Sequence, residues 1–163
     1  PALLIMSLAG LAHILNLCKT EQIKKGCLAF VGIGLLFVGV RMAQDHPFEM
    51  VYFNPLAGSS ETLQSRYEQD YWGLSFRKGL EYVLDSSSIF LVPVMVANDP
   101  GIYNSLLLSP EKRSLIRFTN NPLEARFFIT NFRWHPDNYP LDEAFFLVVH
   151  NSKILSVYRL SKR

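Results

Sequence analysis

Cysteine is scarce in this sequence, with two residues, Cys18 and Cys27, among 163. Residues 44–163 contain none, which excludes a disulfide within that part of the chain. The whole sequence also lacks an Asn-x-Ser/Thr glycosylation acceptor. That second absence fits a bacterial periplasmic domain better than a glycosylated ectodomain of a eukaryote.

Sequence patterns typical of catalytic and metal sites are missing as well. The four histidines are scattered, without the Cys/His or Glu-x-x-His spacing of a metal site. There is no Gly-x-Ser-x-Gly motif and no glycine-rich phosphate loop. Two acidic pairs, Glu68 with Asp70 and Asp142 with Glu143, lie in polar segments, where such acids usually form caps or a solvated face. We therefore expect no complete active site and no cofactor site in this chain.

Positive charge is not concentrated in the polar part of the chain. From Gln44 to Arg163 there are 12 Lys and Arg against 13 Asp and Glu. The formal net charge of +2 for the whole sequence therefore comes from residues 1–43. A nucleic-acid site needs clustered positive charge on the folded domain, so we exclude nucleic acid as a partner.

Two apolar runs stand out near the N-terminus. Residues 1–18 and 27–40 contain no Asp, Glu, Lys or Arg. The first run is long enough to cross a bilayer, and the second becomes so if residues 41–43 are included. We expect residues 1–43 to form two transmembrane helices in a lipid bilayer, joined by a short basic loop at residues 19–26. A buried helical hairpin in a soluble core is the alternative.

The basic loop predicts the orientation of the chain in the membrane. It holds Lys19, Lys24 and Lys25 against Glu21. Positively charged loops stay in the cytoplasm. We therefore expect a bacterial inner-membrane protein with residues 44–163 on the periplasmic side. Because the sequence starts inside an apolar run without an initiator Met, we expect further membrane helices upstream.

Aromatic side chains are dense from residue 46 to residue 76. Directly after a membrane helix, such rings suit the interface between lipid and water. We expect them to hold the domain against the membrane surface and against its own sheet. An aromatic minicore under a loop and a platform for sugar rings are the alternatives. The candidate contacts in this segment are His46, Phe48, Tyr52, Phe53, Asp70, Tyr71 and Trp72.

The following residues predict a small α/β domain. Phe76, Leu80, Val83 and Leu84 recur at helical spacing, with Asp70 or Ser75 as a cap. Strands are expected at 89–97, 114–119, 126–132, 144–150 and 153–160. The first is a continuous apolar run, as in parallel sheets, and should end or bulge at Pro93, which has no N–H to donate. The last two are joined by a two-residue turn at Asn151-Ser152.

The predicted fold class is α/β: two transmembrane helices, then a small extracytoplasmic domain (residues 44–163). We expect that domain to contain a mixed sheet of about five strands and a C-terminal β-hairpin. Arg133, Trp134 and His135 follow the third strand, and binding sites often lie after strand ends. They are therefore candidate contacts too, with plain packing and turn formation as the alternative.

Two stretches resemble a known family. "HPFEMVYFNPLAG" with "RYEQDYWGLSFRKGLEYV" (residues 46–83) resembles the segment after the last membrane helix of bacterial glycosyltransferase family 39 proteins. "ARFFITNFRWHP" with "FFLVVHNSKILSVYRL" (residues 125–160) resembles the end of the same proteins. These are relatives of the dolichyl-phosphate-mannose protein mannosyltransferases and the lipid A aminoarabinose transferases. The shared words follow the same order and cover nearly all of residues 44–163.

The resemblance implies a GT-C membrane glycosyltransferase that takes its sugar from a polyprenyl-phosphate donor. In that superfamily the catalytic acid lies in the first external loop, often with a divalent metal, and this sequence begins downstream of it. The resemblance therefore assigns no catalytic residue here and implies that this chain alone is inactive. A non-enzymatic membrane-anchored module that binds a protein partner or an envelope polymer is the alternative. Donor sugar, acceptor and oligomeric state cannot be derived from the sequence.

Overall fold

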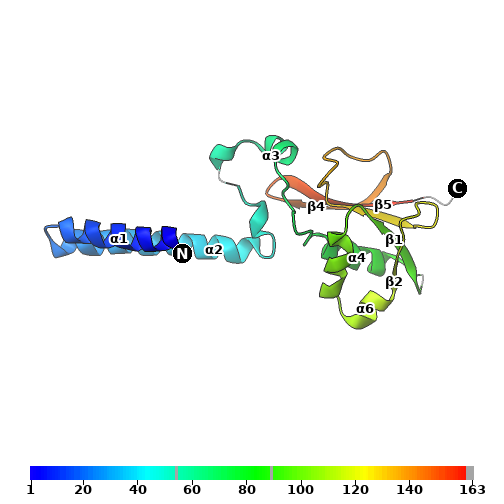
Figure 1. Ribbon diagram of the computed structural model, residues 1–163, viewed down its shortest axis with the longest axis horizontal. Coiled ribbons are helices and arrows are strands. Elements are labelled where there is room, and N and C mark those ends of the chain that lie inside the picture. The colour runs from blue at the N-terminus through cyan, green and yellow to red at the C-terminus, as the bar shows by residue number, and fades with distance from the viewer. Residues whose placement is uncertain (54, 89, 161–163) are drawn as a thin grey trace. The chain divides into compact units, whose positions relative to one another are not determined.

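A computed structural model describes residues 1–53, 55–88 and 90–160. The chain forms two compact units, Pro1–His46 and Pro47–Arg163. Each unit is described by itself, and Figure 1 shows its elements. Two residues named in the sequence analysis lie outside the described ranges. Asn54 belongs to the stretch 46–83 that resembles the known family, and Ile89 is the first residue of the first predicted strand.

The N-terminal unit consists of helices α1 (Ala2–Leu17) and α2 (Glu21–Asp45). At about 1.5 Å per residue, the 25 residues of α2 extend over about 37 Å, and the 16 residues of α1 over about 24 Å. A hydrocarbon core is about 30 Å thick. α2 is therefore long and apolar enough to span a membrane, by length and composition. Of the two predicted spans, α2 reaches this thickness because it continues through both charged flanks of its apolar run, whereas α1 is a shorter apolar helix.

The predicted basic loop at residues 19–26 is also mostly helix. The two helices are joined by residues 18–20 alone. The Thr20 hydroxyl accepts a hydrogen bond from the Ile23 N–H at 3.3 Å, which caps α2 ahead of the lysines. Lys24 then forms an ion pair with Glu21 at 2.8 Å. The cap, rather than the start of the apolar run, sets where this helix begins.

The five-stranded mixed sheet of the second unit confirms the predicted sheet. Its strands are β1 (Val92–Val96), β2 (Ile116–Phe118), β3 (Phe127–Thr130), β4 (Asp142–Val149) and β5 (Ser152–Arg159). Their order is β2-β1-β3-β5-β4 (Figure 1). β1 is parallel to β2 and β3, whereas β5 is antiparallel to β3 and β4. The apolar run of β1 is thus the central strand of the parallel part, as such runs predict.

Pro93 neither ends nor bulges β1, which corrects the prediction. Pro93 pairs with Arg117 of β2, and its carbonyl accepts from the Arg126 N–H at 2.9 Å. In a parallel strand the N–H and C=O of one residue face the same neighbour, so the missing N–H of Pro93 would face β3. β3 begins at Phe127, which pairs with Val94. Proline is tolerated here because the pairing of β1 with β3 begins only at the next residue, Val94, so no N–H is needed at Pro93.

The C-terminal hairpin is present, but its turn lies one residue earlier than predicted. Val149 pairs with Ser152, which leaves His150 and Asn151 as the two turn residues. Both have positive φ, 49° and 63°. A type I′ turn requires positive φ at both positions, and Asn adopts it at low cost. The prediction at Asn151-Ser152 was therefore wrong by one residue.

The remaining elements of this unit are short helices. The 3₁₀ helices are η1 (Glu49–Val51), η2 (Pro55–Ala57) and η3 (Asn104–Leu107). The α-helices are α3 (Ser60–Arg66), α4 (Phe76–Ser86), α5 (Pro100–Tyr103) and α6 (Pro110–Ser114). Of these, α4 packs on β3, β4 and β5.

The two faces of the sheet are covered differently. On one face the predicted stripe of α4 is confirmed: Phe76, Leu80 and Val83 are fully buried against a core that includes Leu155 and Val157 of β5. Because strand side chains alternate between faces, Ile154, Ser156 and Tyr158 of β5 lie on the opposite face. Ile154 packs there against Phe48 and Val51. Residues 47–51 and the loop after β3 therefore take the place of a second helix layer.

Candidate functional site

The candidate site lies on the edge of the sheet where the parallel strands β1 and β3 end. Asn98 and Asn131 follow these strands and are joined by a hydrogen bond of 2.7 Å from the Asn98 Nδ2 to the Asn131 Oδ1. The Asn131 Nδ2 then donates to the main-chain carbonyl of Asp70 at 2.9 Å. The carboxyl ends of parallel strands are a common place for binding sites. The two amides fix the Asp70 loop over this edge.

Asp70 anchors that loop to the start of α4. Its carboxylate accepts the N–H groups of Leu74 at 2.9 Å and Ser75 at 3.2 Å, and also the Ser75 hydroxyl. Ser75 holds the capping position, but its own side chain does not cap the helix. Burial raises the pKa of the Asp70 carboxyl, although the bonds from Ser75 and Leu74 oppose that effect. With all these donors inside its own loop, Asp70 is a structural residue.

Gly73 shapes the same loop and turns two aromatic side chains outward. Its φ is +68°, and a Cβ built there would lie 2.7 Å from the Pro100 Cβ and 2.9 Å from the Phe76 ring. A side chain fits neither the dihedral nor the space. Tyr71 and Trp72, which precede it, are 48% and 67% exposed. The expectation that Trp72 packs against the sheet of its own domain was wrong, because its ring faces solvent, and its contact with a membrane surface stays a prediction.

Arg133 joins the loop after β3 to the Asp70 loop. Its Nε lies 3.1 Å from a Glu68 carboxylate oxygen, and its guanidinium carbon lies 4.1 Å from the centre of the Tyr71 ring. It also lies 5.4 Å from the centre of the Trp134 ring. Phe132, just before it, is buried with a φ of 60°, a costly conformation for a non-glycine residue. The structure thus brings the predicted residues Asp70, Tyr71, Arg133 and Trp134 together.

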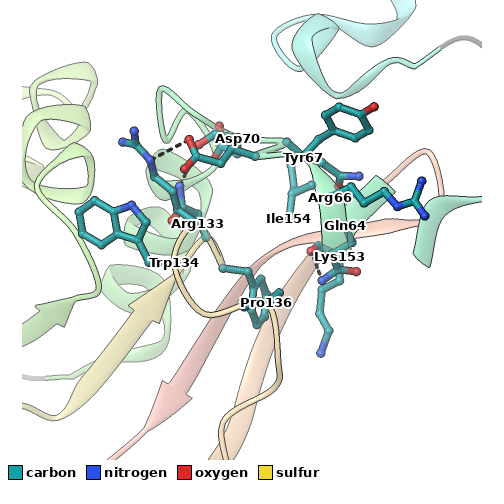
Figure 2. A pocket seen from close by; sticks show the side chains of 13 residues that line it. Gln64, Arg66, Tyr67, Asp70, Arg133, Trp134, Pro136, Lys153 and Ile154 are labelled. Atoms are coloured by element: carbon teal, nitrogen blue, oxygen red, sulfur yellow. Dashed lines mark hydrogen bonds and ion pairs between the residues drawn. The ribbon is translucent and has the colours of Figure 1, made fainter. Parts of the chain in front are cut away.

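A cavity of about 240 Å³ lies between these two loops, on the face of the sheet opposite α4. Figure 2 shows Arg133 and Trp134 on one side of it, and Gln64 and Lys153 on the other. Ile154 of β5, almost fully buried, contributes to the wall. Arg66, Tyr67, Asp70 and Pro136 complete the labelled lining. The cavity is the candidate site.

Gln69 is the most informative residue of the cavity wall. It is 8% exposed, and neither its side-chain oxygen nor its side-chain nitrogen has a hydrogen-bond partner. Most buried polar side chains in folded proteins have a partner, and an unpaired one costs about 1–3 kcal/mol. The side-chain amide of Gln69 is therefore an unpaired polar group buried behind the cavity wall.

A second, apolar groove of about 660 Å³ lies beside the first cavity. Tyr71, Trp72, Tyr103, Leu106 and Leu107 line it, and all five are about half exposed or more. Arg133 lines both spaces. Rings and aliphatic side chains gathered in this way form an apolar patch at the edge of the polar cavity.

The predicted residues at the start of the domain are not part of the cavity. Phe48 is 9% exposed and packs with Val51 and Ile154, as the minicore alternative expects, and its contact with a membrane surface stays a prediction. Tyr52 is about half exposed, with its ring edge-on to His150 at 5.8 Å. Phe53 lies against the Tyr67 ring at 5.3 Å. Adjacent aromatic residues can face core and solvent in turn, and composition alone does not separate them.

His46 and His135 also lie apart from the cavity. His46 ends the N-terminal unit, directly after α2. His135 is exposed, and its Nδ1 lies 2.9 Å from the Asp137 carbonyl oxygen. Its ring stacks at 4.4 Å on Tyr139, which itself packs against Phe128 and Tyr158. For His135 the structure supports the packing and turn role.

No metal-binding group is found in the described ranges 1–53, 55–88 and 90–160, judged by clusters of three or more His, Cys, Asp or Glu. Of the acidic pairs considered from sequence, Glu68 is paired with Arg133 and Glu143 with Lys153. These two side chains thus form ion pairs and are not arranged as a catalytic acid and base.

Sequence reasoning missed Gln69, Asn98, Asn131 and Lys153. Each amide is unremarkable in sequence, and Lys153 lies just after a hairpin turn. Two of them could have been predicted from their position in the chain. Asn98 and Asn131 each lie within two residues of the end of a parallel strand, where binding sites are common. Nothing in the sequence indicates that the side-chain amide of Gln69 is unpaired.

No protein-family model, curated protein or solved structure matches this chain.

Proposed function

We propose that this chain is the C-terminal part of an integral-membrane glycosyltransferase of the GT-C type, with its domain on the acceptor side. The observation that carries the proposal is where the family-like words lie. Asp70 of "DYWG" (residues 70–73) lines the same cavity as Arg133, Trp134 and Pro136 of "RWHP" (residues 133–136), although the two stretches are far apart in sequence. A domain built around such words, following an apolar helix, fits the architecture that the resemblance implies.

In this scheme the chain supplies binding and shape, and not the reacting groups. The donor is a polyprenyl-phosphate sugar, and a carboxylate in an upstream external loop acts as base toward the acceptor hydroxyl. A divalent metal in the full-length protein would lie in that upstream loop. The described residues of this chain offer no cluster for it, so no step here is derived through a metal. The lipid bilayer and the upstream helices are the partners of α1 and α2.

The first test is sugar transfer. We expect purified residues 1–163 to transfer no sugar from a polyprenyl-phosphate donor, because the acidic loop is missing. We expect membranes that contain the complete reading frame to do so, and that frame to encode further apolar spans with an acidic first external loop. Release of labelled polyprenyl phosphate measures turnover. Transfer by residues 1–163 alone, or a start codon directly before Pro1, would refute the proposal.

The second test is topology. We expect residues 44–163 to lie outside the cytoplasm, in a bacterium in the periplasm. Lys19, Lys24 and Lys25 lie near the start of α2, whereas its far end carries one cation, Arg41, which pairs with Asp45 at 3.6 Å. Alkaline phosphatase fused after Arg163 should be active, and green fluorescent protein at the same place should be dark. Fusions at Thr20 should give the reverse pattern and serve as the matched control. A fluorescent fusion at Arg163 would overturn the orientation.

A membrane-anchored binding module without catalysis is the second candidate function. The observation that favours it is the cavity itself, because both of its lining carboxylates are already engaged: Glu68 pairs with Arg133, and Asp70 accepts hydrogen bonds from its own loop. The reading frame upstream distinguishes the two proposals, because a module needs no further membrane spans. Both functions require that the cavity binds a ligand.

A further inference from the structure

We propose that Cys18 and Cys27 are a modification site, at which a reversible disulfide bond ties α1 to α2 near the loop of the helical hairpin. The inference goes beyond the proposed function and does not rest on it, because it concerns the N-terminal unit alone. These are the two cysteines of the sequence, so only one pairing within the chain exists. Both are free and half-buried in the structure.

The burial pattern of the hairpin provides the first step of the argument. Up to residue 40, the chain is exposed except at six half-buried positions: Leu11, Leu15, Cys18, Lys24, Cys27 and Val31. Within each helix these positions are three or four residues apart, which places them on one face. α1 and α2 belong to one compact unit, in which each helix covers the other. The two faces therefore meet in a seam that contains both cysteines.

The two thiol groups are in contact within this seam. The Cys18 thiol donates a hydrogen bond to the Ile14 carbonyl at 3.2 Å, and the side chain of Cys18 is also hydrogen-bonded to that of Cys27. A thiol has one hydrogen to donate, so the Cys18 sulfur is left to accept from the Cys27 thiol. The fold thus brings the two sulfur atoms together across the hairpin.

Cys18 lies where the chain can adjust to a covalent bond. It follows the last residue of α1 and has an extended backbone, with φ of −69° and ψ of 121°. Rotation of the two side chains and a small shift of this connection can bring the sulfurs to bonding distance without breaking either helix.

A metal site is the other use that two neighbouring thiols suggest. Zinc sites in proteins have three or four protein ligands. The part of the chain that the structure describes has no cluster of three or more His, Cys, Asp or Glu side chains. The pair of thiols by itself suits a disulfide better than a zinc ion.

Oxidation by a small disulfide, such as glutathione disulfide, balances without another reactant. One cysteine thiolate attacks a sulfur of the oxidant, whose S–S bond breaks and releases one glutathione thiolate. The second cysteine thiolate attacks the cysteine sulfur of the mixed disulfide, forms the Cys18–Cys27 bond and releases the second glutathione. Two electrons pass to the oxidant, and the two thiol protons pass to the glutathione thiolates. In the topology proposed above the site faces the cytoplasm, where thiols are kept reduced until oxidant rises.

The test uses the full chain in lipid nanodiscs, equilibrated with set ratios of reduced to oxidised glutathione. Acid quenching, alkylation with N-ethylmaleimide and intact mass measure the state of both thiols. We expect the oxidised wild-type chain to lose two hydrogen atoms, to carry neither glutathione nor maleimide, and to stay monomeric on a non-reducing gel. Dithiothreitol should restore both thiols. Cys18→Ser and Cys27→Ser should each stop at the mixed disulfide with glutathione, because the second thiol is missing.

The matched control moves one thiol off the seam. Cys27→Ser combined with Ala29→Cys keeps two cysteines, but position 29 is exposed and lies on another face of α2. Its equilibrium constant for the intrachain disulfide should be lower than that of the wild type by about tenfold or more. In the oxidised wild-type chain, hydrogen exchange at residues 18–27 should be slower than in the reduced chain.

Four results would overturn the inference. The wild-type chain takes up glutathione on both cysteines without closing the bond, it forms disulfides between chains instead, the control variant closes its bond as readily, or hydrogen exchange is unchanged by oxidation. The last result would show that the bond does not hold the two helices together.

Discussion

Asp70→Ala is expected to lower the free energy of unfolding by about 2–4 kcal/mol. Asp70 is 3% exposed, and its carboxylate holds the main-chain N–H groups of Leu74 and Ser75 together with the Ser75 hydroxyl. Removing the carboxylate leaves these donors unpaired in a buried place. Relief of the cost of burying a charge offsets part of the loss. Urea unfolding of the chain in detergent, followed by circular dichroism, measures the difference.

The effect of Asp70→Ala should depend on pH in a defined direction. Burial raises the pKa of Asp70 in the folded chain, so the folded state binds a proton more tightly than the unfolded state does. Stability from this group is then fully present below the unfolded pKa, near 4, and is lost as the pH rises through the raised pKa. The difference between wild type and Asp70→Ala should therefore be larger in acid than at pH 7.

Asp85→Ala is the matched control for this prediction. Asp85 is an exposed carboxylate near the end of α4, and its loss should change stability little at either pH. A small effect of Asp70→Ala would mean that this carboxylate does not hold the Asp70 loop. A difference that grows as the pH rises would mean that its hydrogen bonds outweigh burial and lower its pKa.

The regular part of the fold could be predicted because it depends on local pattern. The stripe of Phe76, Leu80 and Val83 requires a buried helix face, and the apolar run of β1 requires neighbours on both sides. The predictions that failed concern features that depend on the pairing of segments distant in sequence. Pro93 is tolerated because β3 starts one residue later in the register, and that is a property of two strands together.

The candidate site shows the same division. Arg133 and Trp134 could be predicted because they follow a strand, but their partner segment 67–75 could not be paired with them from sequence. The hydrogen bond from Asn131 to the Asp70 carbonyl joins positions 61 residues apart. Gln69 became a candidate only when its neighbours were known, since an unpaired amide is defined by what surrounds it.

The aromatic segment was the hardest to interpret because one composition serves two environments. Within residues 46–76, Phe76 is fully buried whereas Trp72, four residues earlier, is 67% exposed. The turn at Gly73, with a φ of +68°, separates them by reversing the chain. Positive φ at one glycine thus decides which ring enters the core and which faces solvent.

Phe76→Ala is accordingly expected to lower the free energy of unfolding by about 3–5 kcal/mol. The Phe76 ring fills the space under the Gly73 turn and beside Gly101: a Cβ at either glycine would lie within 2.9 Å of it. Its loss leaves a cavity beneath the loop that carries Asp70 and Tyr71.

Trp72→Ala and Phe90→Ala are the matched comparisons for Phe76→Ala. Phe90 is 83% exposed, and Trp72 meets its neighbour Tyr71 edge-on at 5.1 Å without entering the core. Both should cost less than about 1 kcal/mol, because little surface leaves water when these rings are placed. The same urea unfolding measurement serves all three variants. If Trp72→Ala proved as costly as Phe76→Ala, the Trp72 ring would be covered under the conditions of the measurement, and the apolar groove around it would be occupied.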